Sequence, residues 1–245
     1  MAILVLLLDS CMAKTARAAN QPPLRVVESV PTSFLVTEPT EGRVPLARFL
    51  CAHGAGAGIE TPFLTAMAGL LAQRAIATYR FAFAYMTAQQ RGGARRPPRA
   101  ESLIGEYRAA AAAVPTDVPV LIGGKSMGGR VASLIADELH GRGCIAGLVC
   151  LGYPFHPPKK PDQLRTRHLL NLACPALFVQ GERDPFGTRA EVEAFSLSPA
   201  IRIVWARDGD HDLAARRGRG SAADNLAAVA DAVAAFACAL RQLPH

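Results

Sequence analysis

The stretch Gly124-Lys125-Ser126-Met127-Gly128 decides how the rest of this sequence is interpreted. It follows the apolar run Pro119 to Gly123, which has the character of a short strand. It precedes Gly129 to His140, in which apolar residues recur every three or four positions, as in a helix. The pattern G-x-S-x-G between a strand and a helix predicts a nucleophile elbow, a sharp turn that holds the side chain of Ser126 clear of the sheet.

Each residue type of this turn has a physical reason. A serine at so sharp a turn is held in strained backbone geometry, and the glycines two positions before and after it let neighbouring backbone pass closely. The amide of Met127 then faces the place where negative charge would develop on a reacting carbonyl oxygen. A phosphate-binding loop is a poorer interpretation of Gly-Lys-Ser, because that motif requires a glycine where this chain has Pro119.

The length of 245 residues fits one α/β domain with a full core. We expect residues 1–23, which end in Gln21-Pro22-Pro23, to be a disordered N-terminal extension, and residues 24–245 to form a single domain. Strand patterns alternate with helix patterns, which predicts a mostly parallel sheet with helices on both faces. The strands are expected at residues 24–30 and 33–36 (an edge hairpin), 46–51, 75–81, 119–123, 147–151, 176–181 and 201–205, and the helices at 61–74, 100–114, 129–140, 163–172, 191–195 and after Ser221.

Composition and charge exclude several classes of function. The formal net charge of +7 is modest, and the chain has no basic helix or aromatic platform typical of nucleic-acid binding. No uninterrupted apolar run reaches the roughly 18 residues of a membrane span, so we expect no membrane partner. The six cysteines form no CxxC pair and no zinc pattern with histidine, which favours a reducing compartment and a cytoplasmic location.

Two loops rich in glycine or arginine come before the elbow. The first, Ala52 to Gly58, contains His53-Gly54 and three glycines in alternation, but it does not complete a dinucleotide-binding G-x-G-x-x-G. The second, Arg91 to Arg99, is basic and rich in proline. It is interpreted either as a rim that attracts anionic substrate or as an ordinary solvated loop.

Candidate acidic and basic residues follow later strands. Asp184 comes directly after the strand at 176–181, with Glu182 as the alternative acid, and Asp184-Pro185 could instead begin a helical turn. His211 lies in the loop after the last strand, among three aspartates. A metal site there is disfavoured because no further histidine or cysteine is near in sequence.

Taken in order, these stretches resemble a known family. The quoted loops, together with Gly152 to Pro158, Gly181 to Gly187 and Asp208 to Asp212, look like the small, lidless branch of α/β-hydrolases near the dienelactone hydrolases. More narrowly, residues 25–242 resemble bacterial proteins grouped with testis-expressed protein 30 and with a subunit of the eukaryotic NSL histone-acetyltransferase complex. Dienelactone hydrolases carry a cysteine nucleophile where this chain has serine, so their substrate is not carried over.

The resemblance implies a fold and a site. The fold is that of α/β-hydrolases without a large lid. In chain order the triad is Ser126 as nucleophile, Asp184 as acid and His211 as base. The oxyanion hole is formed by the backbone amides of Met127 and Ala55, with Gly56 as the alternative to Ala55, and His53 orients that loop rather than acting as the base.

The corresponding activity is hydrolysis of an ester, thioester or related acyl bond, on a small-molecule acyl substrate and without a cofactor or metal. Two alternatives stay open. A triad of this kind also permits acyl transfer to an acceptor other than water. The NSL-complex subunit is known as a scaffold, so a non-catalytic binding protein on the same fold is the other alternative. The sequence leaves the oligomeric state and the substrate undetermined.

Overall fold

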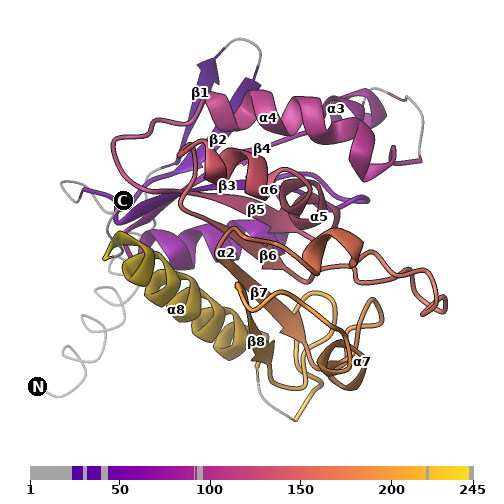
Figure 1. The fold of residues 1–245 in the computed structure, drawn as a ribbon. Coiled ribbons are helices and arrows are strands. Elements are labelled where there is room, and N and C mark those ends of the chain that lie inside the picture. The colour runs from indigo at the N-terminus through magenta and orange to yellow at the C-terminus, as the bar shows by residue number, and fades with distance from the viewer. Residues whose placement is uncertain are drawn as a thin grey trace, which may run out of the picture.

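The computed structural model describes residues 24–29, 32–39, 44–90, 92, 96–218 and 221–242. The predicted N-terminal extension at 1–23 lies outside them. The main feature of the described residues is one eight-stranded sheet in the order β1-β2-β4-β3-β5-β6-β7-β8 (Figure 1). The strands are β1 (Leu24–Ser29), β2 (Thr32–Thr37), β3 (Ala47–Ala52), β4 (Ile76–Phe81), β5 (Val120–Lys125), β6 (Gly147–Leu151), β7 (Ala176–Gly181) and β8 (Ile201–Ala206).

The direction of the strands follows their connections. β2 is antiparallel to both of its neighbours, β1 and β4, and its pairing with β1 forms one edge of the sheet. From β4 to β8 every pairing is parallel. The carboxyl ends of these parallel strands therefore meet at one edge of the sheet, where ligands of open α/β sheets bind.

Helices cover both faces of the sheet, as the alternating sequence pattern predicts (Figure 1). One face packs against α2 and α8, with Leu71 and Val233 fully buried, and the other packs against α4, α5 and α6, with Tyr107 and Val131 fully buried. The helices are α2 (Pro62–Ala72), α3 (Ala84–Gln90), α4 (Ile104–Ala112), α5 (Met127–Ser133), α6 (Ala136–Gly141), α7 (Arg189–Glu193) and α8 (Ala222–Arg241).

The final helix, α8, begins where Ser221 accepts a hydrogen bond from the amide of Asp224. Within the described residues it is the one helix whose length and mean hydropathy would suit a membrane span. Its apolar stripe is nevertheless buried against α2 and the sheet, as expected for a core helix: Val229, Ala230, Val233, Phe236, Ala237 and Leu240.

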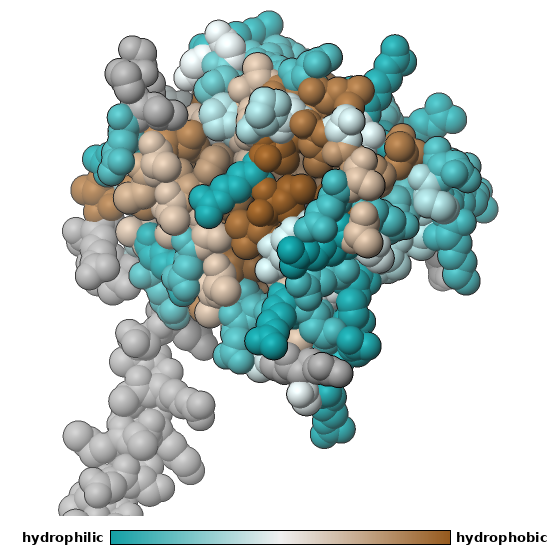
Figure 2. Space-filling view, turned by 60° about the horizontal axis from the view of Figure 1, so that its bottom comes forward, coloured by the Kyte–Doolittle hydropathy of each residue, from teal (hydrophilic) through white to brown (hydrophobic). Residues whose placement is uncertain are grey.

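The strand β8 forms the other edge of the sheet. Arg202 points to solvent, while its neighbours Ile201 and Ile203 are half-buried. Figure 2 shows the face that comes forward when the bottom of Figure 1 is turned toward the viewer, and its brown apolar area is interrupted and surrounded by hydrophilic side chains. Because Arg202 is exposed between two half-buried isoleucines, the edge strand is only partly apolar.

The expected helix at 163–172 is wrong. The structure has a three-residue 3₁₀ turn there, Arg167–Leu169. Tertiary partners take backbone groups that a helix would pair internally: Tyr153 donates to the carbonyl of Arg165, the amide of Arg165 donates to Phe155, and the carbonyl of Leu169 accepts from the amide of Ser198. Residues 152–175 consequently form an extended connection and no lid.

Other boundaries differ in smaller ways. The helix expected at 129–140 is divided into α5 and α6, because the amides of Leu134 and Ile135 bond three residues back instead of four. The helix expected at 100–114 begins with the 3₁₀ turn Ala100–Leu103. The helix α3, which sequence reasoning missed, has no Gly or Pro within it and comes directly before the basic loop.

Candidate active site

The elbow forms as predicted between β5 and α5. Ser126 has φ 50° and ψ −113°, a strained conformation for a residue with a side chain, and its amide donates to the carbonyl of Leu151 over 2.9 Å. A Cβ atom at Gly124 would stand 2.2 Å from the carbonyl oxygen of Ala52, and one at Gly128 would stand 2.5 Å from the same atom. Both glycines are therefore required by the close passage of β3.

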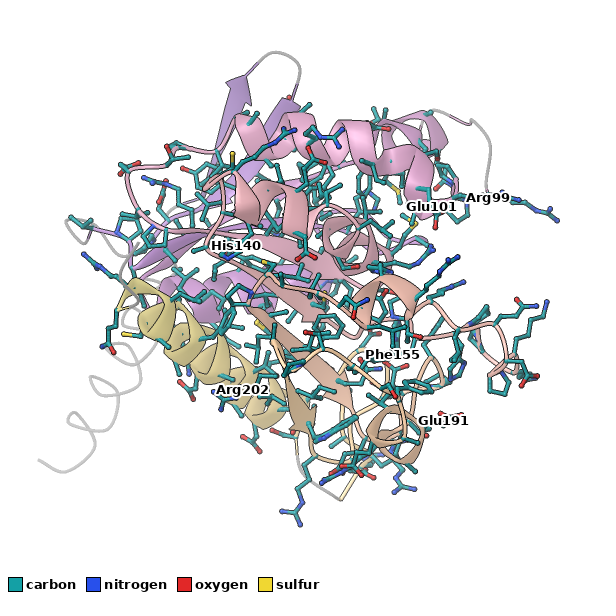
Figure 3. All side chains as sticks on the ribbon, viewed as in Figure 1. Arg99, Glu101, His140, Phe155, Glu191 and Arg202 are labelled. Carbon is teal, nitrogen blue, oxygen red and sulfur yellow. The ribbon has the colours of Figure 1, made fainter. Side chains whose placement is uncertain are left out.

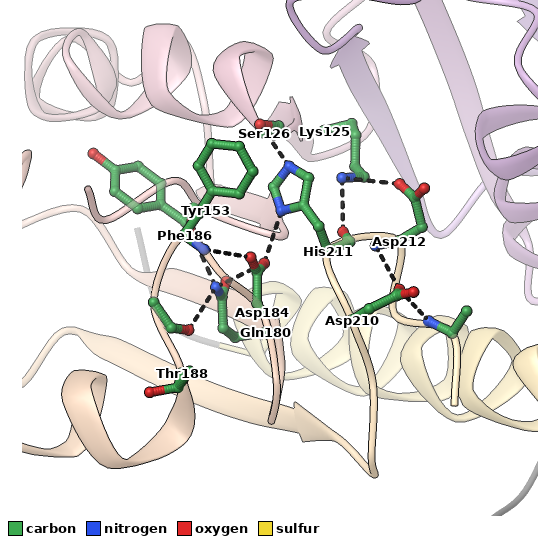
Figure 4. Close-up of polar contacts among 12 residues, drawn as sticks. Lys125, Ser126, Tyr153, Gln180, Asp184, Phe186, Thr188, Asp210, His211 and Asp212 are labelled. Carbon is green, nitrogen blue, oxygen red and sulfur yellow. Dashed lines mark hydrogen bonds and ion pairs between the residues drawn. The ribbon is translucent and has the colours of Figure 1, made fainter. Parts of the chain in front are cut away.

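The structure brings the three predicted triad residues together at the carboxyl edge of the sheet (Figure 4). The Nε2 atom of His211 lies 2.9 Å from the hydroxyl oxygen of Ser126, and its Nδ1 atom lies 2.8 Å from a carboxylate oxygen of Asp184. With Nδ1 protonated, the imidazole donates to Asp184 and accepts from the Ser126 hydroxyl. This tautomer is the one that can take a proton from the serine.

Asp184, and not Glu182, faces the imidazole. Its side chain is fully buried and also accepts hydrogen bonds from the side chain of Gln180 and the amide of Phe186. Glu182 instead accepts from the amide of Asp208 and pairs with Arg189 near the surface. Because the oxygens of a buried carboxylate need hydrogen-bond donors, the bonds from Gln180 and Phe186 are part of the site.

The imidazole of His211 is also held by apolar packing. The ring of Phe186 lies against it, with 4.3 Å between ring centroids. Backbone of the histidine loop approaches β7 so closely that a Cβ at Gly181 would stand 2.2 Å from the carbonyl oxygen of Asp210. Phe186 and Gly181 thus fix where the ring stands, and neither is visible as a site residue from the triad pattern.

The predicted oxyanion loop passes beside Ser126. A Cβ atom at Gly54 would lie 3.8 Å from the Cβ of Ser126. Within the described residues, the amides of Met127 and Ala55 donate to no acceptor. Two free amide donors beside a serine hydroxyl are the arrangement that an oxyanion hole requires.

His53 lies under this loop and is completely buried. Its Nδ1 atom is 2.6 Å from the carbonyl oxygen of Gly54, and its Nε2 atom accepts from the amide of Phe83 over 3.1 Å. Burial lowers the pKa of this imidazole, so it is neutral and donates to Gly54. The side chain links the loops after β3 and β4, which is the orienting position expected from the sequence.

Lys125 is a residue of the site whose place sequence reasoning did not foresee. Its ammonium donates to the carbonyl oxygen of His211 over 2.7 Å, and lies 3.2 Å from a carboxylate oxygen of Asp212 (Figure 4). It also lies over the ring of Phe63, 5.4 Å from the centroid. Burial lowers the pKa of Lys125 while Asp212 opposes that shift. Lys125, the elbow residue before Ser126, thus holds the backbone of His211.

The three aspartates around His211 have separate roles. Asp208 binds Arg216 and Arg183, and the bonds from Arg216 hold its carboxyl pKa well below the ordinary value. Asp210 accepts the amides of Asp212 and Ala214, which shapes the loop. Among the described residues no group of three potential metal ligands converges. The carboxylates of the three aspartates are instead paired with Arg216, with Lys125 and with backbone amides.

A cavity of about 780 Å³ opens beside Ser126 and His211. Its walls come from the glycine-rich loop, α2, the histidine loop and the start of α8. Lys125 and Asp212 are the charged side chains among these wall residues, and most of the remaining surface is apolar. Those apolar residues include Ala55, Phe63, Leu64, Phe186, Ala214 and Leu226.

Comparison with known proteins agrees with this fold. Residues 45–238 match the family model described as an alpha/beta hydrolase domain, so the chain belongs to the α/β-hydrolases. The narrower grouping with testis-expressed protein 30 stays a prediction.

Several solved structures share the fold. A dienelactone hydrolase from Anabaena variabilis is 22% identical with a TM-score of 0.61, covering 88% of this chain and 97% of its own. Est1E from Butyrivibrio proteoclasticus is 14% identical with a TM-score of 0.64, covering 90% and 99%. A serine hydrolase without a lid from Xanthomonas campestris is 16% identical with a TM-score of 0.60, covering 92% and 96%. At these identities the likeness concerns the fold.

Proposed function

We propose that this α/β-hydrolase is a serine hydrolase that cleaves an ester, thioester or related acyl bond through an acyl-enzyme. The observation that carries the proposal is the continuous line of hydrogen bonds from Asp184 through His211 to Ser126. A non-catalytic protein on the same fold would gain nothing evident from a strained serine beside free amide donors and an apolar cavity.

In the acylation step, the Ser126 oxygen attacks the acyl carbon while Nε2 of His211 takes the hydroxyl proton. The amides of Met127 and Ala55 stabilise the negative charge on the former carbonyl oxygen. The bond to the leaving alcohol or thiol then breaks, and His211 returns its proton to that leaving group. Asp184 stays ionised and stabilises the imidazolium throughout.

Deacylation repeats these steps with water as the nucleophile. His211 takes a proton from water, the hydroxide attacks the acyl-enzyme, and the Ser126 oxygen leaves with the proton held by His211. The products are a carboxylic acid and the free serine. These steps use side chains and backbone amides of this chain alone.

The cavity supports an apolar acyl group as substrate. Burial of apolar area stabilises a ligand by roughly 25 cal/mol per Å², and most of the wall beside Ser126 is apolar. Its volume lies within the range typical of small-molecule sites. We therefore include a small-molecule acyl substrate in the proposal.

The experiment that tests the proposal is labelling of the purified protein with a fluorophosphonate, which reacts with activated serines. We expect labelling of the wild type and none of Ser126→Ala or His211→Ala. Well-folded wild type that resists the reagent would contradict the proposal and favour the scaffold alternative. Acyl transfer is separated from hydrolysis by product analysis with added alcohols or amines.

A cytoplasmic location is also proposed. It is supported by the free thiols of Cys51, Cys144, Cys150, Cys174 and Cys238. Oxidative mapping of these cysteines in protein isolated under alkylating conditions would test it, because a disulfide would argue against that location.

A further inference from the structure

The glycine-rich loop after β3 has no side chain that could fix its own shape. From Gly54 to Gly58 it consists of three glycines alternating with two alanines. Glycine loses more conformational freedom than any other residue when its backbone is fixed. An oxyanion donor must nevertheless stand within about 0.5 Å of its productive position. The amide of Ala55 can therefore serve as a donor only if groups outside the loop hold it in place.

Two side chains hold the start of the loop through its carbonyl groups. His53 donates to the carbonyl oxygen of Gly54. The hydroxyl of Tyr85 donates to the carbonyl oxygen of Ala55 over 3.1 Å. Because a trans peptide is planar, its N–H points opposite to its C=O. The bond from His53 therefore fixes the direction of the Ala55 amide, and the bond from Tyr85 fixes the direction of the Gly56 amide.

Tyr85 is itself firmly placed. It lies in the first turn of α3, and the first amide of that helix, of Ala84, donates to the carboxylate of Glu106 over 2.7 Å. The ring of Tyr85 packs against those of His53 and Phe83, with 5.7 and 6.3 Å between ring centroids. Burial and the charge of Glu106 raise the pKa of Tyr85 to about 12. The hydroxyl therefore keeps its proton and donates throughout the neutral pH range.

A second anchor holds the other end of the loop. Arg80 lies on β4 with 1% of its surface exposed. One terminal nitrogen of its guanidinium donates to the carbonyl oxygen of Ile59 over 2.9 Å and to the hydroxyl of Thr65 over 3.2 Å. The other terminal nitrogen donates to the hydroxyl of Thr37 over 3.2 Å. The side chain of Arg80 thus ties the end of the loop to α2 and to β2.

The guanidinium of Arg80 is a buried charge with neutral partners. Its hydrogen bonds go to one carbonyl and two hydroxyls, and its Nε atom is buried without a partner among the described residues. Burial lowers the pKa of Arg80, and the nearby Cys51 and Glu60 oppose that shift only in part. Taking a charge out of water costs free energy, whereas a charged donor bonds a carbonyl more strongly than a neutral one. Arg80 therefore contributes a firm hold on Ile59 more than it contributes stability.

We propose that Tyr85 and Arg80 are positioning residues, which hold the two ends of the glycine-rich loop so that the amide of Ala55 stays directed at the oxyanion of the acyl-transfer step. Both side chains stand outside the wall of the cavity beside Ser126, so they act through the loop. The catalytic part of this proposal rests on the proposed hydrolase function. The part that concerns the order of the loop is measured without any activity.

The order of the loop is tested by NMR relaxation of its three glycine amides in the full-length protein. We expect order parameters of about 0.85 in the wild type and values falling toward about 0.6 in Tyr85→Phe, which removes only the hydroxyl. Tyr153→Phe is the matched control, because the hydroxyl of Tyr153 also donates to a loop carbonyl, that of Arg165, over 2.9 Å. Low order in the wild type, or equal order in Tyr85→Phe and the wild type, would overturn the proposal.

Ester kinetics with the same variants test the catalytic part. Because an oxyanion donor acts in the transition state, its displacement lowers kcat and leaves KM unchanged. We expect Tyr85→Phe to lower kcat about tenfold with KM within about twofold of the wild type, and Tyr153→Phe to change neither. A raised KM at unchanged kcat, or a lower Tm at unchanged kcat, would contradict the positioning role. If the wild type cleaves no ester, the hydrolase function fails, while the relaxation measurement still decides whether Tyr85 orders the loop.

The second anchor is tested by Arg80→Lys, which keeps the charge but replaces the planar fork of donors by a single nitrogen. We expect the same pattern, a kcat lowered about tenfold at unchanged KM, with lower order at Gly58, the glycine next to Ile59. Arg202→Lys is the matched control, because Arg202 is exposed on β8, the strand farthest from β4 in the sheet (Figure 3). Unchanged loop order in Arg80→Lys, or its failure to fold, would contradict the positioning role of Arg80.

Discussion

Two histidines stand at the carboxyl edge of the same parallel sheet, in loops that follow β3 and β8. His53 is completely buried, and both its ring nitrogens bond backbone groups, of Gly54 and Phe83. His211 keeps 23% of its side chain exposed, and both its ring nitrogens bond side chains, of Asp184 and Ser126. The residue type and the place in the fold are alike, so the difference lies in the partners.

The difference teaches what makes an imidazole a base. Backbone amides and carbonyls are too weak as acids and bases to transfer a proton in catalysis near neutral pH, so the two backbone bonds of His53 only fix geometry. In the proposed mechanism, the hydroxyl on one side gives His211 a proton to take, and the carboxylate on the other side stabilises the resulting charge. The contrast predicts that His211 governs activity and His53 governs the loop.

The largest effect is expected from His211→Ala. Without the base, Ser126 loses its proton acceptor, and we expect ester turnover to fall about 10⁴–10⁶-fold with little change in Tm. Steady-state kinetics and a thermal melt check both parts. Turnover within a hundredfold of the wild type would mean that another group serves as base and would erase the contrast with His53.

The reverse pattern is expected from His53→Ala. It leaves the amide of Phe83 without an acceptor and opens a cavity under the oxyanion loop, so we expect a loss of about 2–4 kcal/mol in the free energy of unfolding. Turnover should fall no more than the roughly 10²–10³-fold that removal of one oxyanion donor costs. Chemical denaturation and fluorophosphonate labelling of the folded fraction measure the two effects, and complete loss of labelling would contradict this role.

A smaller effect is expected from Lys125→Met, which keeps the apolar stem over Phe63 but removes the donor to the carbonyl of His211. The histidine loop is then less firmly placed, and we expect kcat to fall about tenfold, equivalent to roughly 1.4 kcal/mol. The control is Asp212→Asn, whose side chain is mostly exposed and should cost about twofold. Equal turnover in Lys125→Met and the wild type would show that the loop needs no such anchor.

The smallest effect concerns pH. Burial lowers the pKa of His53, and lowers that of His168 to about 4, so the folded protein holds both imidazoles neutral while the unfolded chain protonates them near pH 6.5. More protons are then bound by the unfolded state, and stability falls as pH decreases from about 6.5 toward about 4. Urea denaturation across this range checks the direction, and a His168→Asn variant should flatten the slope.

The sequence alone determined the elements with strong local signals. The elbow can be predicted from the sequence because only glycine fits beside β3 at positions 124 and 128, where a Cβ would meet the carbonyl of Ala52. The alternation of strands and helices determined the parallel sheet, and the chain order of Ser126, Asp184 and His211 followed from that topology. Each of these features depends on hydrophobic periodicity or on backbone sterics, and both are set by residues that are close together in the sequence.

The tertiary structure decided what depends on partners distant in sequence. The choice of Asp184 over Glu182 rests on which carboxylate β7 turns toward His211, and the role of Lys125 rests on a carbonyl 86 positions away. The absence of a helix at 163–172 rests on Tyr153 and Ser198, which bond backbone carbonyls of that segment. A charge pattern in the sequence shows how many acids and bases exist, but only packing decides which of them meet, as Lys125 and Asp212 do.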